Sequence, residues 1–128
     1  MELRLDVVTP NGLKLSEEVD SVVVRTPEGE MGFLKNHAPL VAALVPQALR
    51  YTKAGETHKL FVSGGFVEVA DNVCSVVTPV AEETTEIDFK RAQEARERAL
   101  RRLNSSEQID EVRARLALAR ANARLSLQ

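Results

Sequence analysis

The chain has 128 residues, which is enough for one ordinary domain or two small ones. Hydrophobic residues make up 44% of it, which excludes a disordered chain, and its apolar runs are far shorter than the roughly 20 residues of a membrane-spanning helix. The net charge of −2 is unevenly divided, since the first 85 residues carry 7 basic and 12 acidic side chains and the rest carry 10 basic and 7 acidic. This asymmetry predicts two modules with different roles.

The first 80 or so residues have the pattern of short strands separated by turn residues. In "ELRLDVV" the side chains of Leu3, Leu5 and Val7 fall on one face, and "TPNG" is a turn signal. Further β-rich runs are "DSVVVRT", "HKLFVSGGFVEVA" and "NVCSVVTPV". Regularly spaced short strands of this kind predict an antiparallel β-sandwich or barrel over residues 1–84.

Two glycines, Gly64 and Gly65, interrupt one of these β-rich runs. Such a pair is typical of a β-bulge or of a close approach by a partner's backbone, and the sequence favours the bulge. It is not a dinucleotide-binding fingerprint, because no helical pattern follows it.

The pattern becomes helical after Thr85. Glycine and proline are absent beyond Pro79, while Ala, Arg, Leu and Glu dominate. Asn104-Ser105-Ser106 interrupts this run with turn residues and N-cap candidates, so residues 85–128 are predicted to form an antiparallel hairpin of two helices. We expect Thr85 to be the N-cap of the first helix, with Asp88 at the N3 position, close to a capping box.

Both predicted helices carry an apolar stripe at helical spacing, and we expect the two stripes to face each other. Alanine-rich stripes bury little surface, at roughly 25 cal/mol per Å², and isolated two-helix hairpins are marginal. The hairpin therefore depends on the β module, a ligand or a partner, and it can rearrange. The stripes comprise Ala92, Ala95, Ala99 and Leu103 on the first helix, and Ile109, Val112, Leu116, Ala119 and Ala123 on the second.

The helical part is also rich in arginine. Nine of the ten basic residues from Glu86 onward are arginines, with Lys90 as the exception. Arg98 lies seven residues after Arg91, and on the second helix Arg113, Arg120 and Arg124 follow at intervals of seven and four. Because guanidinium groups bind phosphate oxygens bidentately, two converging arginine rows predict a site for a polyphosphate anion.

Five segments, in this order, resemble the epsilon subunit of bacterial F-type ATP synthases. They are "DVVTPNG", "GEMGFLKNHAPLVAAL", "SGGFVEV", "EIDFKRA" and "RARLALARANARL", and together they extend over essentially the whole chain. The resemblance implies the same order of modules, with a β-sandwich over residues 1–84 and a regulatory helical hairpin over residues 85–128.

The resemblance also implies a function. Epsilon subunits are non-catalytic parts of the central stalk, the rotor of the proton-translocating ATP synthase, and they couple the gamma subunit to the c-subunit ring. Their mobile C-terminal helices inhibit ATP hydrolysis by the alpha/beta catalytic head. Such a subunit reaches the membrane only through its complex, on the cytoplasmic face of the bacterial plasma membrane. It needs no obligatory cofactor and no metal, and it binds no nucleic acid.

The string "EIDFKRA" matches the I/L-D-x-x-R-A motif with which some members of this family bind ATP as a regulatory ligand. In those members the aspartate accepts a hydrogen bond from the adenine amino group, and arginines of both helices meet the phosphates. Glu82 stands where the family has a site glutamate, six residues before Asp88. The ATP-binding residues implied by the resemblance are Glu82, Ile87, Asp88, Arg91, Ala92, Arg98, Arg120 and Arg124.

A second implied site faces the gamma subunit and the c ring. The acidic loop around Glu28 and Glu30 fits a contact to polar loops of the c ring, and Met31 and His37 belong to the same implied contact. His37 could instead be a loop histidine with a purely structural role, because no nucleophile or base accompanies it in an elbow motif.

Two other classes of function are open to the sequence. One is a nucleic-acid-binding module that uses the arginine-rich hairpin, against which stand the acidic chain and the scarcity of aromatic residues. The other is a β-sandwich enzyme built around His37. The chain has no GxxxxGK[ST] loop to hold a nucleotide for phosphoryl transfer, and its single cysteine, Cys74, allows no CxxC metal site. We therefore expect no enzyme activity, a reducing compartment and, since no basic start precedes an apolar segment, no secretory signal.

Overall fold

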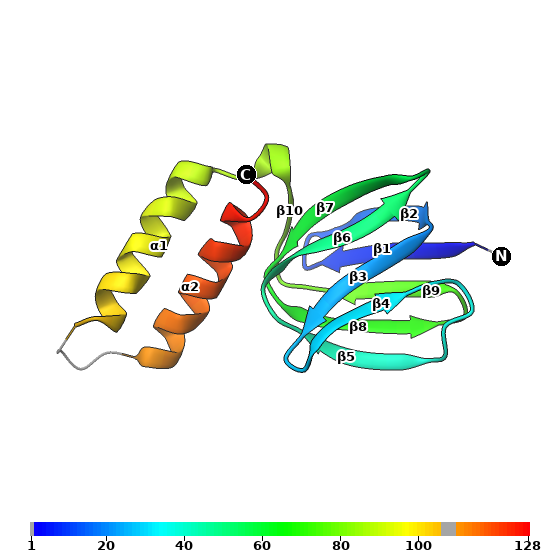
Figure 1. Ribbon diagram of the computed structural model, residues 1–128, viewed down its shortest axis with the longest axis horizontal. Helices are drawn as coiled ribbons and strands as arrows, with labels where there is room; N and C mark the ends of the chain where they lie inside the picture. Colours follow the sequence, from blue (N-terminus) through cyan, green and yellow to red (C-terminus); the bar gives the residue numbers. More distant parts are fainter. Residues whose placement is uncertain (1, 106–109) are drawn as a thin grey trace.

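The computed structural model describes residues 2–105 and 110–128 of the chain. A β-sandwich is followed by a helical hairpin that lies beyond one end of the sandwich, opposite the end that holds the N-terminus (Figure 1). The predicted fold class, a β-sandwich followed by a two-helix hairpin, is therefore confirmed. Among the described residues no helix is both long and apolar enough to cross a membrane.

Two five-stranded sheets form the sandwich. The first has the order β2-β1-β9-β8-β5 and the second the order β10-β7-β6-β3-β4. The strands are β1 (Leu3–Thr9), β2 (Gly12–Val19), β3 (Ser21–Thr26), β4 (Gly29–Phe33), β5 (Leu40–Leu44), β6 (Gln47–Lys53), β7 (Glu56–Val62), β8 (Gly65–Ala70), β9 (Val73–Val77) and β10 (Ala81–Glu83).

One strand pair departs from the antiparallel pattern that the sequence predicts. β1 and β9 run parallel in the middle of the first sheet, with Leu5 opposite Cys74 and Val7 opposite Val76, whereas every other described pair is antiparallel. This parallel pair joins two segments that are about 70 residues apart in the sequence. Local periodicity cannot reveal a pairing between such distant segments.

The core lies between the two sheets. Leu3, Leu5 and Val7 are buried, as the alternation of β1 predicts, and Phe33 and Leu49 meet them from the second sheet. All the residues of this core cluster belong to the sandwich, and none comes from the described helices.

Gly65 begins β8 and shows why the glycine pair is present. β8 pairs with both neighbouring strands without a register shift, so the predicted bulge is wrong. Instead, Gly65 has a φ of +93°, and a Cβ there would collide with the backbone carbonyl of Val77 on β9. The close approach is made within the chain.

The hairpin consists of α1 (Phe89–Leu103) and α2 (Glu111–Leu125), preceded by a short 3₁₀ helix, η1 (Thr84–Glu86). Thr85 is not the N-cap of α1, because it lies within η1. Asp88 takes that place and accepts from the backbone N–H of Arg91 at 3.0 Å. The predicted N-cap of the second helix is also displaced, to Asp110, while Ser106 lies outside the described residues.

The two apolar stripes have different outcomes. On α1 the stripe is confirmed, since Ala92 and Ala99 are buried. On α2 the expected stripe is wrong at Val112 and Leu116, which are 69% and 47% exposed, and of its described members only Ala123 is buried, against the sandwich. Ala114 and Ala121 are buried instead. Since α2 has alanines on several faces, its period alone could not identify the face that meets α1. Of the remaining members, Ala119 and Ala123 line a groove beside the sandwich, and Ile109 lies outside the described residues.

A small second core attaches the hairpin to the sandwich. Phe61 on β7 packs with Ile87, Ala123 and Leu127, and Phe89 lies against this group. Because so few apolar side chains join the two parts, the attachment is weaker than the sandwich itself.

Candidate functional site

A cavity of about 470 Å³ lies where the hairpin meets the segment that leaves the sandwich. Carboxylates line one side of it, and arginines reach it from both helices. Small alanine side chains between the arginines leave the space open. The lining residues are Glu82, Glu86, Asp88, Arg91, Ala92, Ala95, Arg98, Ala117, Arg120, Ala121 and Arg124.

The arginines converge because of their spacing on two antiparallel helices. Arg91 and Arg98 are seven residues apart on α1, and Arg120 and Arg124 are four apart on α2, so each pair lies on one helical face. Arg91, Arg98 and Arg120 form no salt bridge with any described residue. Three guanidinium groups therefore remain available to an anion in the cavity.

Asp88 has two roles that the structure separates. Its Oδ1 caps α1, and an identical cap is made at α2, where Asp110 accepts from the N–H of Arg113 at 3.0 Å. Both helices thus begin with the pattern D-x-x-R, and helix capping alone accounts for each aspartate. Only Asp88 also lines the cavity.

Glu82 connects the sandwich to α2. Its Oε1 accepts from Nε of Arg124 at 2.7 Å, and the guanidinium group of Arg124 lies 4.3 Å from the ring centroid of Phe61. Arg124 is therefore partly neutralised by Glu82, unlike the other three arginines of the cavity. The contact favours the hairpin position that forms the cavity.

Glu86 is held from two sides. Oε1 accepts from Nζ of Lys14 at 2.6 Å and from the backbone N–H of Glu83 at 2.9 Å. The Lys14 hydrogen bond, then the Glu83 backbone bond, lowers the pKa of the Glu86 carboxyl below its ordinary value. Its negative charge is thus balanced by Lys14.

Seven of the eight residues that the sequence assigns to ATP binding lie in the lining of this cavity: Glu82, Asp88, Arg91, Ala92, Arg98, Arg120 and Arg124. Ile87 does not, because its side chain packs with Phe61 and Leu127 in the second core. Arg113, the first member of the arginine row on α2, is exposed and outside the lining.

Four lining residues are absent from the sequence-based assignment: Glu86, Ala95, Ala117 and Ala121. Helical spacing could have suggested three of them, since Ala95 lies one turn after Arg91, and Ala117 and Ala121 each lie three residues before an arginine of the cavity, Arg120 and Arg124. Nothing in the sequence distinguishes Glu86 from its neighbour Glu83, because only the distant Lys14 gives it a defined position.

Of the four residues assigned to the gamma and c-ring contact, three lie together in the structure and one lies apart. Glu28, Glu30 and Met31 line a shallow cavity together with residues of β5. Glu30 accepts from Arg50 at 2.8 Å and from Arg25 at 3.3 Å.

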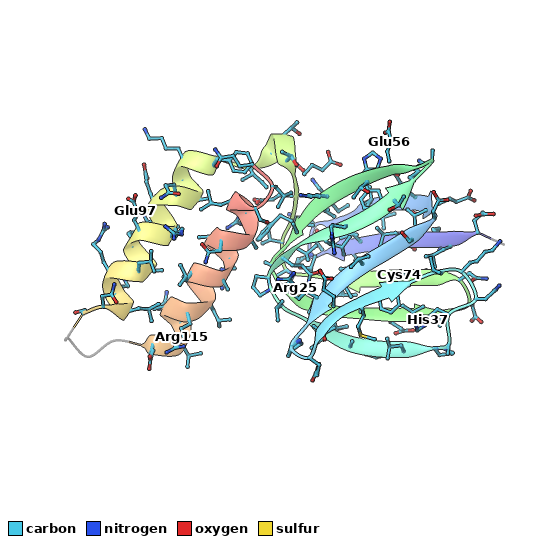
Figure 2. All side chains as sticks on the ribbon, viewed as in Figure 1. Arg25, His37, Glu56, Cys74, Glu97 and Arg115 are labelled. Atoms are coloured by element: carbon cyan, nitrogen blue, oxygen red, sulfur yellow. The ribbon has the colours of Figure 1, made fainter. Side chains whose placement is uncertain are left out.

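His37 lies apart from that cavity. It stacks edge-on against Phe33, and its Nδ1 donates to the carbonyl of Ala38 at 2.6 Å. Figure 2 shows His37 far from the hairpin, whereas Arg25 lies on the side of the sandwich that faces α2.

The first sheet carries an exposed apolar row on its outer face. Leu13, Val8, Val77 and Phe66 are register partners across four adjacent strands, and all are exposed. We call these four residues the outer row. A contiguous apolar row of this kind is typical of a protein–protein contact.

Within the described residues, no group of three or more His, Cys, Asp or Glu side chains is placed to hold a metal ion. The cavity is lined by four guanidinium groups and three carboxylates. Lys14 adds a further positive charge next to Glu86.

Comparison with known proteins agrees with the division of the chain into a sandwich and a hairpin. Residues 2–84 match the beta-sandwich domain of the ATP synthase delta/epsilon chain, and residues 85–127 match its long alpha-helix domain. The ATP synthase epsilon chain of Nitratidesulfovibrio vulgaris (strain DP4) is 46% identical over 127 residues, covering 98% of this chain and 95% of its own. That of Syntrophomonas wolfei is 48% identical over 123 residues, covering 94% and 90%.

Solved structures show the same fold. A chain of the Euglena gracilis mitochondrial ATP synthase, in an assembly of OSCP, F1 and c-ring, superposes with a TM-score of 0.84 at 29% identity, covering 95% of this chain and 78% of that one. A chain of the Tetrahymena thermophila mitochondrial ATP synthase has a TM-score of 0.65 at 15% identity, with 99% and 93% covered, a likeness of fold alone. Family models that span almost the whole chain, together with relatives close to half identical, give one answer: the chain belongs to the ATP synthase delta/epsilon chain family, as an epsilon-type, non-catalytic subunit.

Proposed function

We propose that the chain is a rotor subunit of the central stalk that couples the gamma subunit to the c-subunit ring and senses ATP through its hairpin. In the compact state, with the hairpin closed against the sandwich, the hairpin binds ATP as a regulatory ligand. In an extended state along gamma, the arginine-rich α2 meets the alpha/beta catalytic head and inhibits ATP hydrolysis. The subunit is then peripheral to the membrane, on the cytoplasmic face of the bacterial plasma membrane, through its complex.

The observation that carries the ligand part of this proposal is the arginine-lined cavity. Its guanidinium groups come from both helices, and its carboxylates come from β10 of the sandwich (Glu82) and from the segment that joins β10 to α1 (Glu86 and Asp88). The cavity therefore exists only when the hairpin is closed against this segment. A ligand that binds such a cavity stabilises the closed state by its differential affinity for the two states.

Simple linkage gives the size of this effect. ATP at about 100 times its dissociation constant stabilises the state that binds it by roughly 2.7 kcal/mol, a change of about a hundredfold in the ratio of states. The hairpin is held by one small apolar group and by the contacts of Arg124 and Lys14. A weak attachment of this kind can be shifted by a ligand contribution of that magnitude.

The coupling part of the proposal is supported by two surfaces of the sandwich. The outer row supplies an apolar face for the gamma subunit, and the loop of Glu28, Glu30 and Met31 supplies a polar edge for the c ring. The Euglena gracilis chain similar to this one comes from an assembly that includes F1 and a c-ring. We propose the boundary between the fixed and the moving module at Thr84–Thr85, inside η1.

Calorimetry of the full chain with ATP tests the ligand part. We expect saturable binding to the intact chain, and we expect Arg98→Ala and Arg120→Ala each to weaken it about tenfold, because each removes a charged contact to phosphate. Arg115→Ala is the matched control, since Arg115 is an exposed α2 arginine outside the cavity that pairs with Glu111. No binding at millimolar ATP would refute the ligand part.

The inhibitory part needs a separate experiment on the assembled ATP synthase. A complex that contains the chain truncated after Thr84 should hydrolyse ATP faster than one that contains the full chain. Equal hydrolysis at low ATP concentration, where the extended state should prevail, would count against inhibition by the hairpin.

A further inference from the structure

Lys14 occupies an irregular position in β2. Across the antiparallel pair of β1 and β2, Val7 lies opposite Leu15, whereas the next residue, Val8, lies opposite Leu13. Lys14 is therefore the additional residue of a β-bulge and has no partner on β1. Bulges change the direction of a side chain and often occur beside functional sites.

The bulge directs Lys14 to the start of the hairpin. Its ammonium group donates to both oxygens of Glu86, at 2.6 Å and 2.8 Å, across 72 positions of sequence. The side chain of Lys14 is 27% exposed and that of Glu86 is 45% exposed, so the ion pair is partly shielded from solvent. The Lys14–Glu86 pair thus joins β2, an edge strand of the first sheet, to η1, which follows β10, an edge strand of the second sheet.

Glu86 transmits this contact to the cavity. The same carboxylate accepts from the backbone N–H of Glu83, and the side chain of Glu83 accepts in return from the backbone N–H of Glu86. This reciprocal pair is a capping box that closes the turn of η1. Ile87 follows immediately and is buried against Phe61, and Asp88 then caps α1. The position of the first turn of α1, including Arg91, thus depends on the position of Glu86.

We propose that Lys14 is a positioning residue for the nucleotide site, acting through Glu86. This inference rests on the proposed binding of ATP, and it assigns to the sandwich a direct part in the affinity of a site that the hairpin otherwise forms.

Two physical effects follow from the contact. Lys14 fixes the turn before α1, which preorganises Asp88 and Arg91 for the ligand. It also neutralises Glu86, which lines the cavity and would otherwise repel phosphate oxygens. Removal of Lys14 therefore leaves an unpaired carboxylate next to the bound anion, whereas removal of both charges does not.

The experiment measures ATP affinity calorimetrically in the full chain and in four variants. Lys14→Met should weaken binding about two- to fivefold, the range expected for a partly exposed ion pair. Lys14→Arg should restore the wild-type affinity. Lys14→Met combined with Glu86→Gln should bind more tightly than Lys14→Met alone, because the repulsive charge is gone. Lys53→Met is the control, since Lys53 forms a similar pair with Glu17 elsewhere on the sandwich.

The outcomes separate this inference from the proposal on which it rests. If the wild-type chain does not bind ATP, the proposed ligand fails and this role of Lys14 fails with it. If the wild-type chain binds ATP and Lys14→Met binds equally well, only the role of Lys14 is refuted. If Glu86→Gln does not relieve the loss of affinity in Lys14→Met, the repulsion of phosphate by Glu86 is refuted and the fixed turn alone carries the role of Lys14. A similar loss in Lys53→Met would overturn the proposal, because a general loss of stability would then explain the result.

Discussion

Arg124 of α2 donates from Nε to Oε1 of Glu82 at 2.7 Å, and its guanidinium group lies 4.3 Å from the ring centroid of Phe61. This arginine is thus the main polar contact between the second helix and the sandwich. Its partners lie on two neighbouring strands, β10 and β7, of the same sheet. The arrangement ties the end of α2 to the sheet edge.

Arg124→Met should therefore loosen the hairpin without unfolding the sandwich. The ion pair and the ring contact together are worth about 1 kcal/mol, because both side chains of the pair remain roughly a quarter exposed. Hydrogen exchange should show faster exchange of the α2 amides and unchanged exchange of β1 and β9. The control is Arg115→Met, which removes an exposed pair within α2. Equal protection of α2 in both variants would contradict this role.

Asp88 offers a way to separate capping from ligand binding. Asp88→Ala should lose about 1 kcal/mol of helix stability, as should Asp110→Ala, whereas Asp88→Asn should keep the cap, because asparagine caps as well as aspartate. Circular dichroism measures the helicity and calorimetry measures ATP binding. Asp88→Asn should then weaken ATP binding without lowering the helicity. Asp110→Ala should lower the helicity without altering any residue that lines the cavity. A large loss of helicity in Asp88→Asn would contradict the assignment of the cap.

Gly65 should be among the least replaceable residues of the sandwich. Gly65→Ala places a Cβ against the carbonyl of Val77 at a positive φ, so we expect a loss of about 3 kcal/mol or more in the free energy of unfolding. Gly55→Ala is the matched control, because Gly55 also has a positive φ, of +80°, but has open space around it. It should lose only about 1 kcal/mol. Urea unfolding monitored at the β-sheet signal measures both, and equal losses would show that the close approach is unimportant.

Cys74 should make the sandwich less stable at alkaline pH. Burial, and to a lesser extent the charge of Asp6, raises the pKa of the Cys74 thiol to about 12. Between the ordinary thiol pKa and about 12, the unfolded chain releases this proton and the folded chain keeps it. Stability therefore falls as pH rises through this range, by at most about 1.4 kcal/mol per pH unit.

Denaturation of the wild-type chain and of Cys74→Ala as a function of pH measures this contribution. The difference in pH dependence between the two is the part due to the thiol. The same pKa predicts that alkylating reagents react with Cys74 near neutral pH only when the sandwich opens. Rapid alkylation of the folded chain at pH 8 would contradict both expectations.

Several features of this protein are determined by local sequence. The alternation of Leu3, Leu5 and Val7 sets the buried face of β1, and the loss of Gly and Pro after Pro79 marks the change to helices. The spacing of Arg91 and Arg98, and that of Arg120 and Arg124, likewise follows from a period of 3.6 residues, so the sequence alone predicts that each pair shares a face. Local pattern suffices in these cases because each depends only on residues within a few positions of one another.

Other features depend on contacts between distant segments, and only the tertiary structure decided them. The face of α2 that meets α1, the parallel pairing of β1 with β9, and the collision that requires Gly65 each involve a neighbour far along the chain. The first long helix is capped by Asp88 and not by Thr85 because Glu83 and Glu86 close a separate turn, and Lys14 of the β-bulge, 72 positions away, holds that turn in place. Sequence periodicity carries no information about such a partner, since the energy that selects it arises only when the two segments pack together.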